Sequence, residues 1–242
     1  MVDINLYVAL PLVVATFSVV QSIFGVGLLL FGTPTLLLLG MPFPEAIAAL
    51  LPCSLAVDLL QLRNGLPANR AYIRRLFGVT LPLVCLGLII ALTRTRPEGL
   101  ALLVGAMLLV LGLLRCASGA VRRIQSRVVR YQTAYMAGMG FLHGLSNMGG
   151  GLLVVLASAL TNEKEETRRI IAVGYSLFAI TQLTTLYIVA PHSFYLWRFS
   201  LPLVAIGVYL VGNTFYRRLE EGTFQKLLTA LILAYGALLV VK

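Results

Sequence analysis

The sequence predicts an all-α polytopic membrane protein with two inverted repeats, each a glycine-broken helical hairpin followed by three transmembrane helices. Three observations support this prediction. Hydrophobic residues make up 59% of the 242 residues, charged residues only 12%, and the mean hydropathy is +0.93. Short stretches of the first half recur in the second half, and the basic residues divide unevenly between alternate loops. Soluble domains contain about 25% charged residues, so this composition excludes a soluble domain.

The first apolar segment is too long for a single membrane span. From Ile4 to Pro44 no residue is charged, a run of 41 positions. One straight helix of that length would measure about 60 Å, twice the hydrocarbon thickness of a bilayer. We expect the run to break and fold back at Phe24–Gly27 or at Gly32–Pro34, because glycine and proline release the helical hydrogen-bond ladder.

A second charge-free run and several shorter apolar segments follow. The run Tyr131–Asn162 is expected to break at Asn147–Gly151, where three glycines stand together. The first run lacks the basic region of a signal peptide, so we expect it to be retained as membrane structure. Single spans are expected at Ala46–Leu62, Tyr72–Thr93, Gly99–Leu114, Ile170–Val189, Leu196–Tyr216 and Lys226–Val241.

Two matches in the same order indicate an internal duplication. Leu81–Gly87 matches Leu201–Gly207 at an offset of 120 residues, and Gly25–Leu29 matches Gly149–Leu153 at an offset of 124. Apolar stretches often match by chance, but two ordered matches at nearly the same spacing favour a repeat. The predicted units are two transmembrane repeats, residues 1–120 and residues 121–242.

Loop charge favours a hairpin in each half and an inverted relation between the halves. If both long runs are hairpins, one face carries 15 basic residues and the other only Arg94, Arg96, Arg198 and Lys242. If each long run crosses once instead, the division is 11 against 8. The positive-inside rule expects the first division. Three spans then follow each hairpin, and an odd number of spans inverts the second half relative to the first.

Most polar side chains of the apolar runs lie near the two expected breaks. A broken helix exposes backbone N–H groups and the positive end of a helix dipole, which together bind anions. The alternative is that the glycines serve close packing, the hydroxyl groups bond to their own backbone, and the histidine packs in the core. The candidate substrate-binding residues are Gln21, Ser22, Gly25, Gly27, His143, Ser146, Asn147, Gly149, Gly150, Gly151 and Arg168.

Two ionisable residues near these breaks each have two readings. Arg168 could form a bidentate pair with an oxyanion, or it could pair with the acidic cluster Glu163–Glu166 that precedes it. Asp58 lies within an apolar span, where a carboxylate costs about 2.5–3.5 kcal/mol on insertion scales. It is a candidate for proton coupling, or for a local ion pair with Arg63 five residues further on or with another basic loop residue.

The sequence contains few features that indicate metal binding, nucleic-acid binding or enzymatic catalysis. The three cysteines and two histidines have no metal-ligand spacing, so we expect no metal and no cofactor. The net charge of +10 lies in short loops, which favours contact with membrane lipid rather than nucleic acid. No nucleophile elbow, His-Glu-x-x-His or Walker loop is present. A membrane-embedded enzyme and an accessory subunit remain alternatives to a transporter.

Motifs in both halves resemble a known family. The segment Gly140–Gly151, followed by Lys164–Arg168, resembles the second-repeat signature of the TauE/SafE sulfite-exporter family. In the first half, Gly25–Gly27 with Pro34 resembles the same pattern, and Arg63–Gly65 resembles the basic-glycine turn of the family. The resemblance covers nearly the whole chain.

This resemblance implies a permease for small sulfur-containing anions such as sulfite or organosulfonates in the inner (cytoplasmic) membrane. The implied partners are a small anionic substrate and membrane lipid, with a homodimer left open. The chain departs from the family pattern at Ala49-Leu50, where a hydroxyl pair is frequent, and it lacks a proline after the second glycine cluster. These departures leave the particular anion open, with a carboxylate or an inorganic anion as the alternative substrate.

Overall fold

The computed structural model describes residues 6–94, 125–161 and 163–218, and every regular element in these ranges is helical. Five of the described helices are long and apolar enough to cross a membrane. The protein is therefore a multi-pass helical membrane protein. The first half contains α1 (Leu6–Phe24), α2 (Leu28–Leu38), α3 (Phe43–Gln61), η1 (Leu62–Asn64), α4 (Arg70–Arg75), η2 (Leu76–Thr80) and α5 (Leu81–Arg94). The second half contains α8 (Gln132–Ser146), α9 (Gly150–Leu160), α10 (Lys164–Val189), η3 (Pro191–Ser193), η4 (Leu196–Ser200) and α11 (Leu201–Arg218).

The predicted spans in the described ranges agree with these helices within a few residues, except that α10 begins at Lys164, before the predicted start at Ile170. α4, the π-helical η2 and α5 together form one span of 25 residues, and η4 leads into α11 to form another. The expected spans Gly99–Leu114 and Lys226–Val241 lie outside the described residues. Some basic residues of the charge division, Arg96 and Lys242 among them, also lie outside, so the full division stays a prediction.

The first long run breaks at Gly25–Gly27. α1 ends at Phe24, and Gly25 follows with φ +73°, a left-handed conformation that favours glycine. The Gly25 N–H group donates to the Gln21 carbonyl oxygen at 2.8 Å, which closes the last turn of α1. The alternative break at Gly32–Pro34 is wrong, because these residues lie inside α2. Neighbouring helices bury this part of α2, and in such surroundings a helix tolerates a proline.

The second long run breaks at the predicted place. α8 ends at Ser146, and Asn147 adopts φ 60° and ψ 15°, the left-handed conformation that asparagine tolerates better than most residues. α9 then begins at Gly150. In both halves a long apolar run is therefore split into a longer helix and a returning helix of 11 residues. Each returning helix is about 16 Å long, roughly half the hydrocarbon thickness.

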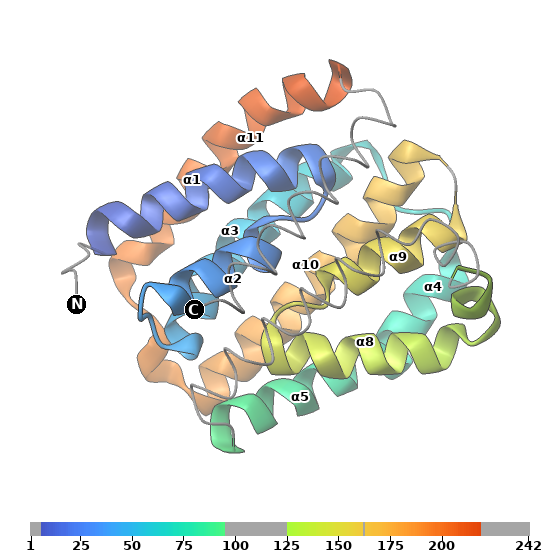
Figure 1. Ribbon diagram of the computed structural model, residues 1–242, viewed down its shortest axis with the longest axis horizontal. Helices are drawn as coiled ribbons and strands as arrows, with labels where there is room; N and C mark the ends of the chain where they lie inside the picture. The colour runs from blue at the N-terminus through green and yellow to red at the C-terminus, as the bar shows by residue number, and fades with distance from the viewer. Residues whose placement is uncertain (1–5, 95–124, 162, 219–242) are drawn as a thin grey trace.

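The two hairpins enter the bundle from opposite ends (Figure 1). In that view α1 runs from left to right and α2 returns to the left, whereas α8 runs from right to left and α9 returns to the right. The next helices, α3 and α10, also run in opposite directions. The inverted relation of the two halves as repeats stays a prediction.

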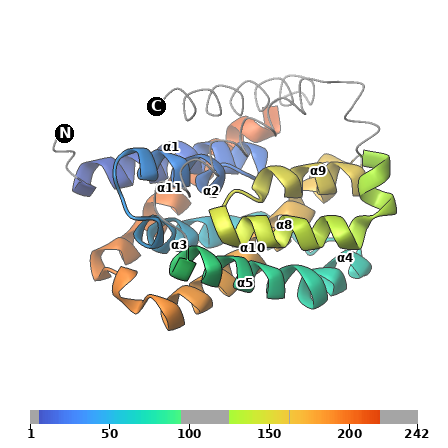
Figure 2. The same cartoon turned by 60° about the horizontal axis from the view of Figure 1, so that its bottom comes forward.

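Helix contacts follow a pattern that is the same when the halves are exchanged. α3 packs against α10 at the centre of the bundle. The helix that opens each half packs against the last described helix of the other half. Thus α1 lies on α11, and α8 lies on α5 (Figures 1 and 2). Likewise α3 contacts α11 and α10 contacts α5. Each half therefore depends on the other for its packing.

Glycine allows the close approach of α5 and α8. A Cβ atom placed on Gly144 would lie 2.1 Å from the carbonyl oxygen of Val84, and one on Gly87 would lie 2.4 Å from that of Phe141. Neither position can take a larger residue unless the helices separate. Small residues at such contacts are typical of helix pairs in membranes, where backbones pack closely.

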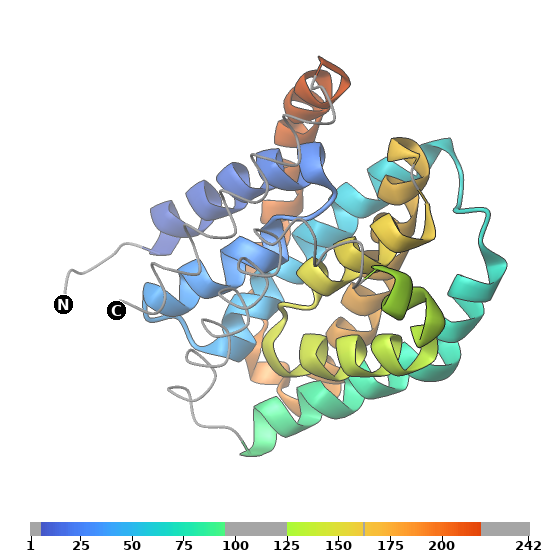
Figure 3. The same ribbon diagram turned by 45° about the vertical axis from the view of Figure 1, so that its right-hand side comes forward.

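The described basic loops gather at one end of the bundle (Figure 3). The loop after α3 is joined to the start of α10 by a hydrogen bond from the Ala68 N–H group to Glu166 Oε1 at 2.8 Å. Arg75 of α4 donates to Gln132, which opens α8. The opposite end contains Arg198, whose guanidinium pairs with Glu45 Oε2 at 2.8 Å. Apolar side chains point outward between the two ends, as a lipid-facing surface requires: Tyr187, Ile188, Leu203 and Leu210 are all more than half exposed.

Candidate functional site

Gln21 is the polar centre of the first hairpin. Its side chain is fully buried, and its Oε1 accepts a hydrogen bond at 3.2 Å from the N–H group of Leu28, the first residue of α2. Its Nε2 donates to Asp58 Oδ1 at 2.8 Å and to Ser54 Oγ at 2.9 Å, both on α3. Gln61 of α3 donates to the Gln21 carbonyl oxygen at 2.9 Å. One side chain thus spans the helix break and ties both half-helices to α3.

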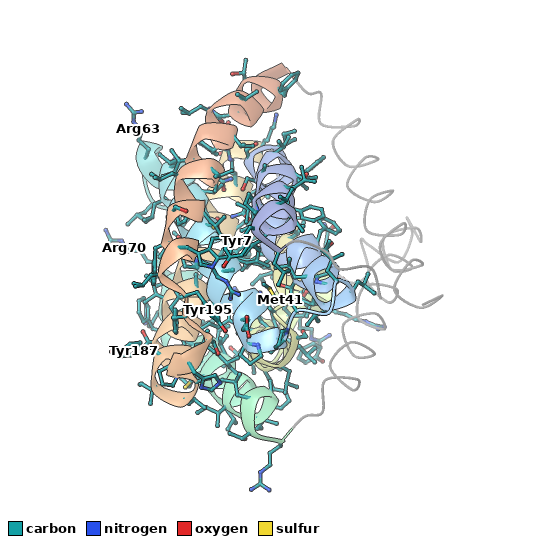
Figure 4. The ribbon with its side chains drawn as sticks, turned by 90° about the vertical axis from the view of Figure 1, so that its left-hand side faces the viewer. Tyr7, Met41, Arg63, Arg70, Tyr187 and Tyr195 are labelled. Carbon is teal, nitrogen blue, oxygen red and sulfur yellow. The ribbon has the colours of Figure 1, made fainter. Side chains whose placement is uncertain are left out.

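Asp58 faces the first hairpin and not the loop that follows α3. The residue is fully buried and also accepts from Ser54 Oγ at 3.2 Å. The expected ion pair with Arg63 is wrong, because no ion pair joins these two residues in the described part of the chain. Arg63 is exposed and projects away from the bundle (Figure 4). The cause is helical phase, since five residues turn the two side chains to different faces.

His143 has the corresponding place in the second hairpin. Its Nδ1 accepts a hydrogen bond at 3.1 Å from the N–H group of Gly149, which immediately precedes α9. Its Nε2 lies 3.1 Å from Gln182 Oε1 on α10. An amide oxygen can only accept, so these contacts fit the neutral imidazole with its proton on Nε2. The ring packs at 4.5 Å between centroids on Phe178, which fixes its orientation.

The tip of the second hairpin touches the returning helix of the first hairpin. Asn147, at the second break, donates from Nδ2 to Thr33 Oγ1 of α2 at 2.9 Å, and both side chains are fully buried. Gly25, at the first break, lies beside Ile171 of α10, since a Cβ atom placed on it would be 3.5 Å from that side chain. The structure therefore brings the candidate residues of the two halves into one buried region.

The serine hydroxyl groups near the breaks bond to their own helices. Ser22 Oγ donates to the carbonyl oxygen of Val19, and Ser146 Oγ donates to that of Leu142, each at 2.7 Å. Ser146 Oγ also accepts from the N–H group of Met148 at 3.3 Å. Both serines therefore fit the alternative given above, in which hydroxyl groups near the breaks bond to the backbone of their own helix.

Arg168 is directed at the end of α1. It is 9% exposed, and its Nη2 donates to the carbonyl oxygen of Ser22 at 3.0 Å. Nη1 and Nη2 both donate to Asn213 Oδ1 at 3.1 Å, and Nη2 contacts Tyr209 Oη at 3.3 Å. The last carbonyl groups of a helix have no partner within it and attract cations. Arg168 therefore binds α1 to α10 and α11 at the first break.

The acidic cluster before α10 pairs with a neighbour of Arg168. Arg169 Nε lies 3.3 Å from Glu166 Oε2, and its side chain is 30% exposed. Arg169 and Glu166 line an open hollow of about 560 Å³ at the basic end of the bundle, together with Asn69 and Thr161. This hollow does not include the residues of the two breaks.

The glycines at the breaks permit contacts that a side chain would block. A Cβ atom on Gly27 would lie 2.7 Å from the backbone nitrogen of Gln21, and one on Gly149 would lie 2.5 Å from the Cβ of His143. One on Gly150 would lie 1.5 Å from Tyr175 Oη. Close packing is thus part of their role. Gly151, also buried, lies in the first turn of α9, whose leading N–H groups have no partner within the helix.

Sequence reasoning missed several residues that the structure places at the breaks. Ser54 and Gln61 flank Asp58 on α3 at spacings of four and three, so the three share one helix face. That spacing is a signal available in the sequence. Tyr209 and Asn213 of α11 also share a helix face at a spacing of four, but only the tertiary packing brings that face to Arg168. The sequence marks further polar residues of the apolar runs that the candidate set does not include: Thr33, Tyr175 and Gln182.

The described part of the chain contains no group of three histidine, cysteine, aspartate or glutamate side chains that could hold a metal ion. The buried polar groups at the breaks are amides, hydroxyl groups, one imidazole, one carboxyl and one guanidinium. Such a set can bind and orient a small polar solute. It contains no arrangement of nucleophile, base and orienting acid in the described hydrogen bonds.

The fold and the buried site together define a membrane protein of the transporter class, in which two interrupted helices meet inside a bundle of spans. A family model described as sulfite exporter TauE/SafE matches residues 10–239. The chain belongs to the TauE/SafE sulfite-exporter family, since the match covers nearly its whole length. No curated protein and no solved structure matches the chain.

Proposed function

We propose that this protein is a secondary transporter that moves a small sulfur-containing anion, such as sulfite or an organosulfonate, across the inner membrane. The family match supports an exporter of this kind. A carboxylate or another inorganic anion is the alternative substrate. The proposal includes two inverted repeats with the boundaries expected from the sequence, supported by the opposite directions of the two hairpins (Figure 1).

The observation that carries the proposal is the contact between the tip of the second hairpin and α2, the returning helix of the first hairpin. Asn147 and Thr33 are hydrogen-bonded at 2.9 Å in the interior, and both are fully buried. Two helix breaks inside a membrane protein leave polar backbone at membrane depth, and such backbone is tolerated only where it is buried in protein or lines a cavity. In alternating-access transporters, substrate binds where the broken helices of the two repeats come together near the midplane.

In this proposal the candidate residues divide into two roles. The N–H groups of Gly150 and Gly151 and the amide of Asn147 would bind the anion, because helix N-termini and amide donors favour negative charge. Gln21 and His143 would hold the breaks in shape, through their bonds to Leu28 and Gly149. A third set would shape the first break and complete the two tips: Gly25, Gly27, Ser22, Ser146 and Arg168.

Asp58 is the proposed coupling residue for protons. It is a fully buried carboxyl group whose described hydrogen bonds come from neutral donors, Gln21 and Ser54. Intramembrane carboxyl groups of this kind mark proton pathways in pumps and transporters. A proton taken up or released by Asp58 would change its bond to Gln21, and Gln21 is the residue that spans the first break.

Counterflow in proteoliposomes tests the transport function. Vesicles preloaded with unlabelled anion are diluted into labelled sulfite, thiosulfate, sulfoacetate, sulfate or acetate, and uptake of label is followed. We expect saturable exchange of sulfite or a sulfonate that protein-free vesicles do not show. Exchange of acetate alone would replace the sulfur anion with a carboxylate. No exchange of any anion by folded, inserted protein would contradict a carrier function.

A further inference from the structure

Tyr175 of α10 carries a buried hydroxyl group that no other group in the described ranges bonds. The residue is fully buried, and its Oη has no hydrogen-bond partner in the described part of the chain. A buried polar group without a partner costs about 1–3 kcal/mol. Two other tyrosines of the interior are bonded instead: Tyr72 Oη donates to the Ile170 carbonyl oxygen at 2.9 Å, and Tyr135 Oη donates to that of Leu152 at 2.7 Å.

The hydroxyl group of Tyr175 is aimed at the start of α9. A Cβ atom on Gly150, the first residue of that helix, would lie 1.5 Å from Oη and 2.6 Å from Cζ. His143 holds the tyrosine ring in place, with its own ring edge-on at 6.1 Å between centroids. A glycine at position 150 is thus what allows Oη to reach the first turn of α9.

The buried polar groups of the second break that lack a partner among the described residues are mostly hydrogen-bond donors. The first turn of a helix presents N–H groups without partners within the helix and carries a partial positive charge. Gln182, seven residues after Tyr175 on the same face of α10, also has a buried Nε2 without a partner among the described residues. Asn147 Oδ1 is an unpartnered acceptor in the same part of the structure. A half-turn of that amide would let Thr33 donate to Oδ1 and would free Nδ2 for an anion.

We infer that Tyr175 Oη and the first-turn N–H groups of α9, Gly150 to Leu152, form the subsite for the charged group of the substrate. This inference rests on the proposed transport function and adds the groups of this chain that would receive the charged end of the substrate. The donors approach from two helices, α9 and α10, and therefore from different directions. A pyramidal SO₃ group, as in sulfite or a sulfonate, has three oxygens to receive them, whereas a carboxylate has two in one plane. The subsite accordingly selects the SO₃ group.

The test compares Tyr175→Phe with Tyr72→Phe in the full-length protein. For each variant we would measure the melting temperature in detergent and the concentration of sulfite, sulfoacetate and acetate that half-saturates counterflow. A hydrogen bond to a charged group supports an affinity change of about 10- to 100-fold. We expect Tyr175→Phe to raise the half-saturating concentrations of sulfite and sulfoacetate by this factor. Its melting temperature should stay unchanged or rise. We expect Tyr72→Phe to lower the melting temperature and leave the half-saturating concentrations unchanged.

The outcomes separate this inference from the proposed function. If the wild-type protein exchanges sulfite and Tyr175→Phe does so at the same half-saturating concentration, the subsite is wrong and the transport function stands. If Tyr175→Phe melts lower by as much as Tyr72→Phe, the hydroxyl group is bonded within the protein, which also overturns the subsite. If the wild-type protein exchanges none of the anions, the proposed function itself fails.

Discussion

Gln21 and His143 perform the same structural task in the two halves of the molecule. Each accepts a hydrogen bond from the N–H group at the start of a returning helix, Leu28 for Gln21 and Gly149 for His143. Each also bonds to a polar side chain of the next span, Asp58 in α3 or Gln182 in α10. Asp58 and Gln182 are 124 residues apart, the same offset that relates the glycines of the two breaks. The two halves thus share a structural device that is built from different residues.

This equivalence predicts that glutamine can replace histidine at the second break. We expect His143→Gln to keep the fold, because its Oε1 can accept from Gly149 as Gln21 Oε1 accepts from Leu28. His143→Leu leaves the Gly149 N–H group buried without a partner and should cost about 1–3 kcal/mol of stability. Thermal unfolding in detergent measures both variants. Equal loss in the two would show that the ring fills space and that its hydrogen bond contributes little.

The proposed role of Asp58 predicts that a variant at this position can still exchange the anion across the membrane but cannot accumulate it. Asp58→Asn keeps an oxygen that can accept from Gln21 but cannot carry a proton or a charge. We expect the variant to retain counterflow and to lose uptake driven by a pH gradient, measured in the same vesicles. Glu45→Gln is the matched control, because that carboxylate pairs with Arg198 at the other end of α3 and should leave accumulation intact. Accumulation by Asp58→Asn at the wild-type level would exclude Asp58 from coupling.

The contact between α5 and α8 predicts a strong dependence on glycine at one position. Gly144→Ala would place a methyl group 2.1 Å from the Val84 carbonyl oxygen, so the helices must separate, at a cost of roughly 1–3 kcal/mol. At Gly138 of the same helix, a Cβ atom would have no other atom within 4 Å. We therefore expect Gly138→Ala to melt at or above the wild-type temperature. Similar melting of the two variants would contradict the close packing.

The contact between Arg168 and Asn213 predicts that the two residues are energetically coupled. Arg168→Ala leaves the Ser22 carbonyl oxygen and the Asn213 side chain without their donor, so we expect lower stability as well as lower transport. A double-mutant cycle with Asn213→Ala should give a coupling energy of about 0.5–3 kcal/mol. Arg169→Ala is the control, since its ion pair with Glu166 is partly exposed and such pairs contribute about 0–1 kcal/mol. Additive changes in the free energy of unfolding at positions 168 and 213 would show that the two residues are not coupled.

The sequence is sufficient to locate the second helix break and most of the spans, and it narrows the first break to two positions. Glycine at position 25 and asparagine at position 147 adopt left-handed backbone conformations, and these residue types indicate such positions locally. The sequence does not decide between Gly25–Gly27 and Gly32–Pro34 as the first break. A proline breaks a helix only when the neighbouring groups do not compensate for the backbone hydrogen bond that it removes. Burial of α2 by neighbouring helices provides that compensation here.

The candidate site is predictable as a region and not as a set of bonds. The sequence identifies Gln21, Asn147 and Arg168 as polar residues near the breaks, and all three are buried there. Their partners come from distant parts of the chain: Asp58 for Gln21, Thr33 for Asn147 and Asn213 for Arg168. Helix periodicity indicates which residues share a face but not which face of another helix it meets.

The sequence by itself determined the class of protein, the two broken hairpins and the end of the bundle where basic residues gather. These features depend on composition, on local backbone preference and on loop charge, all of which act along the chain. Only the tertiary structure decided that Asp58 bonds to Gln21 instead of Arg63, and that Tyr175 faces Gly150. Those contacts follow from close packing of helices from both halves, which fixes side chains to within a fraction of an ångström and has no signature in one dimension.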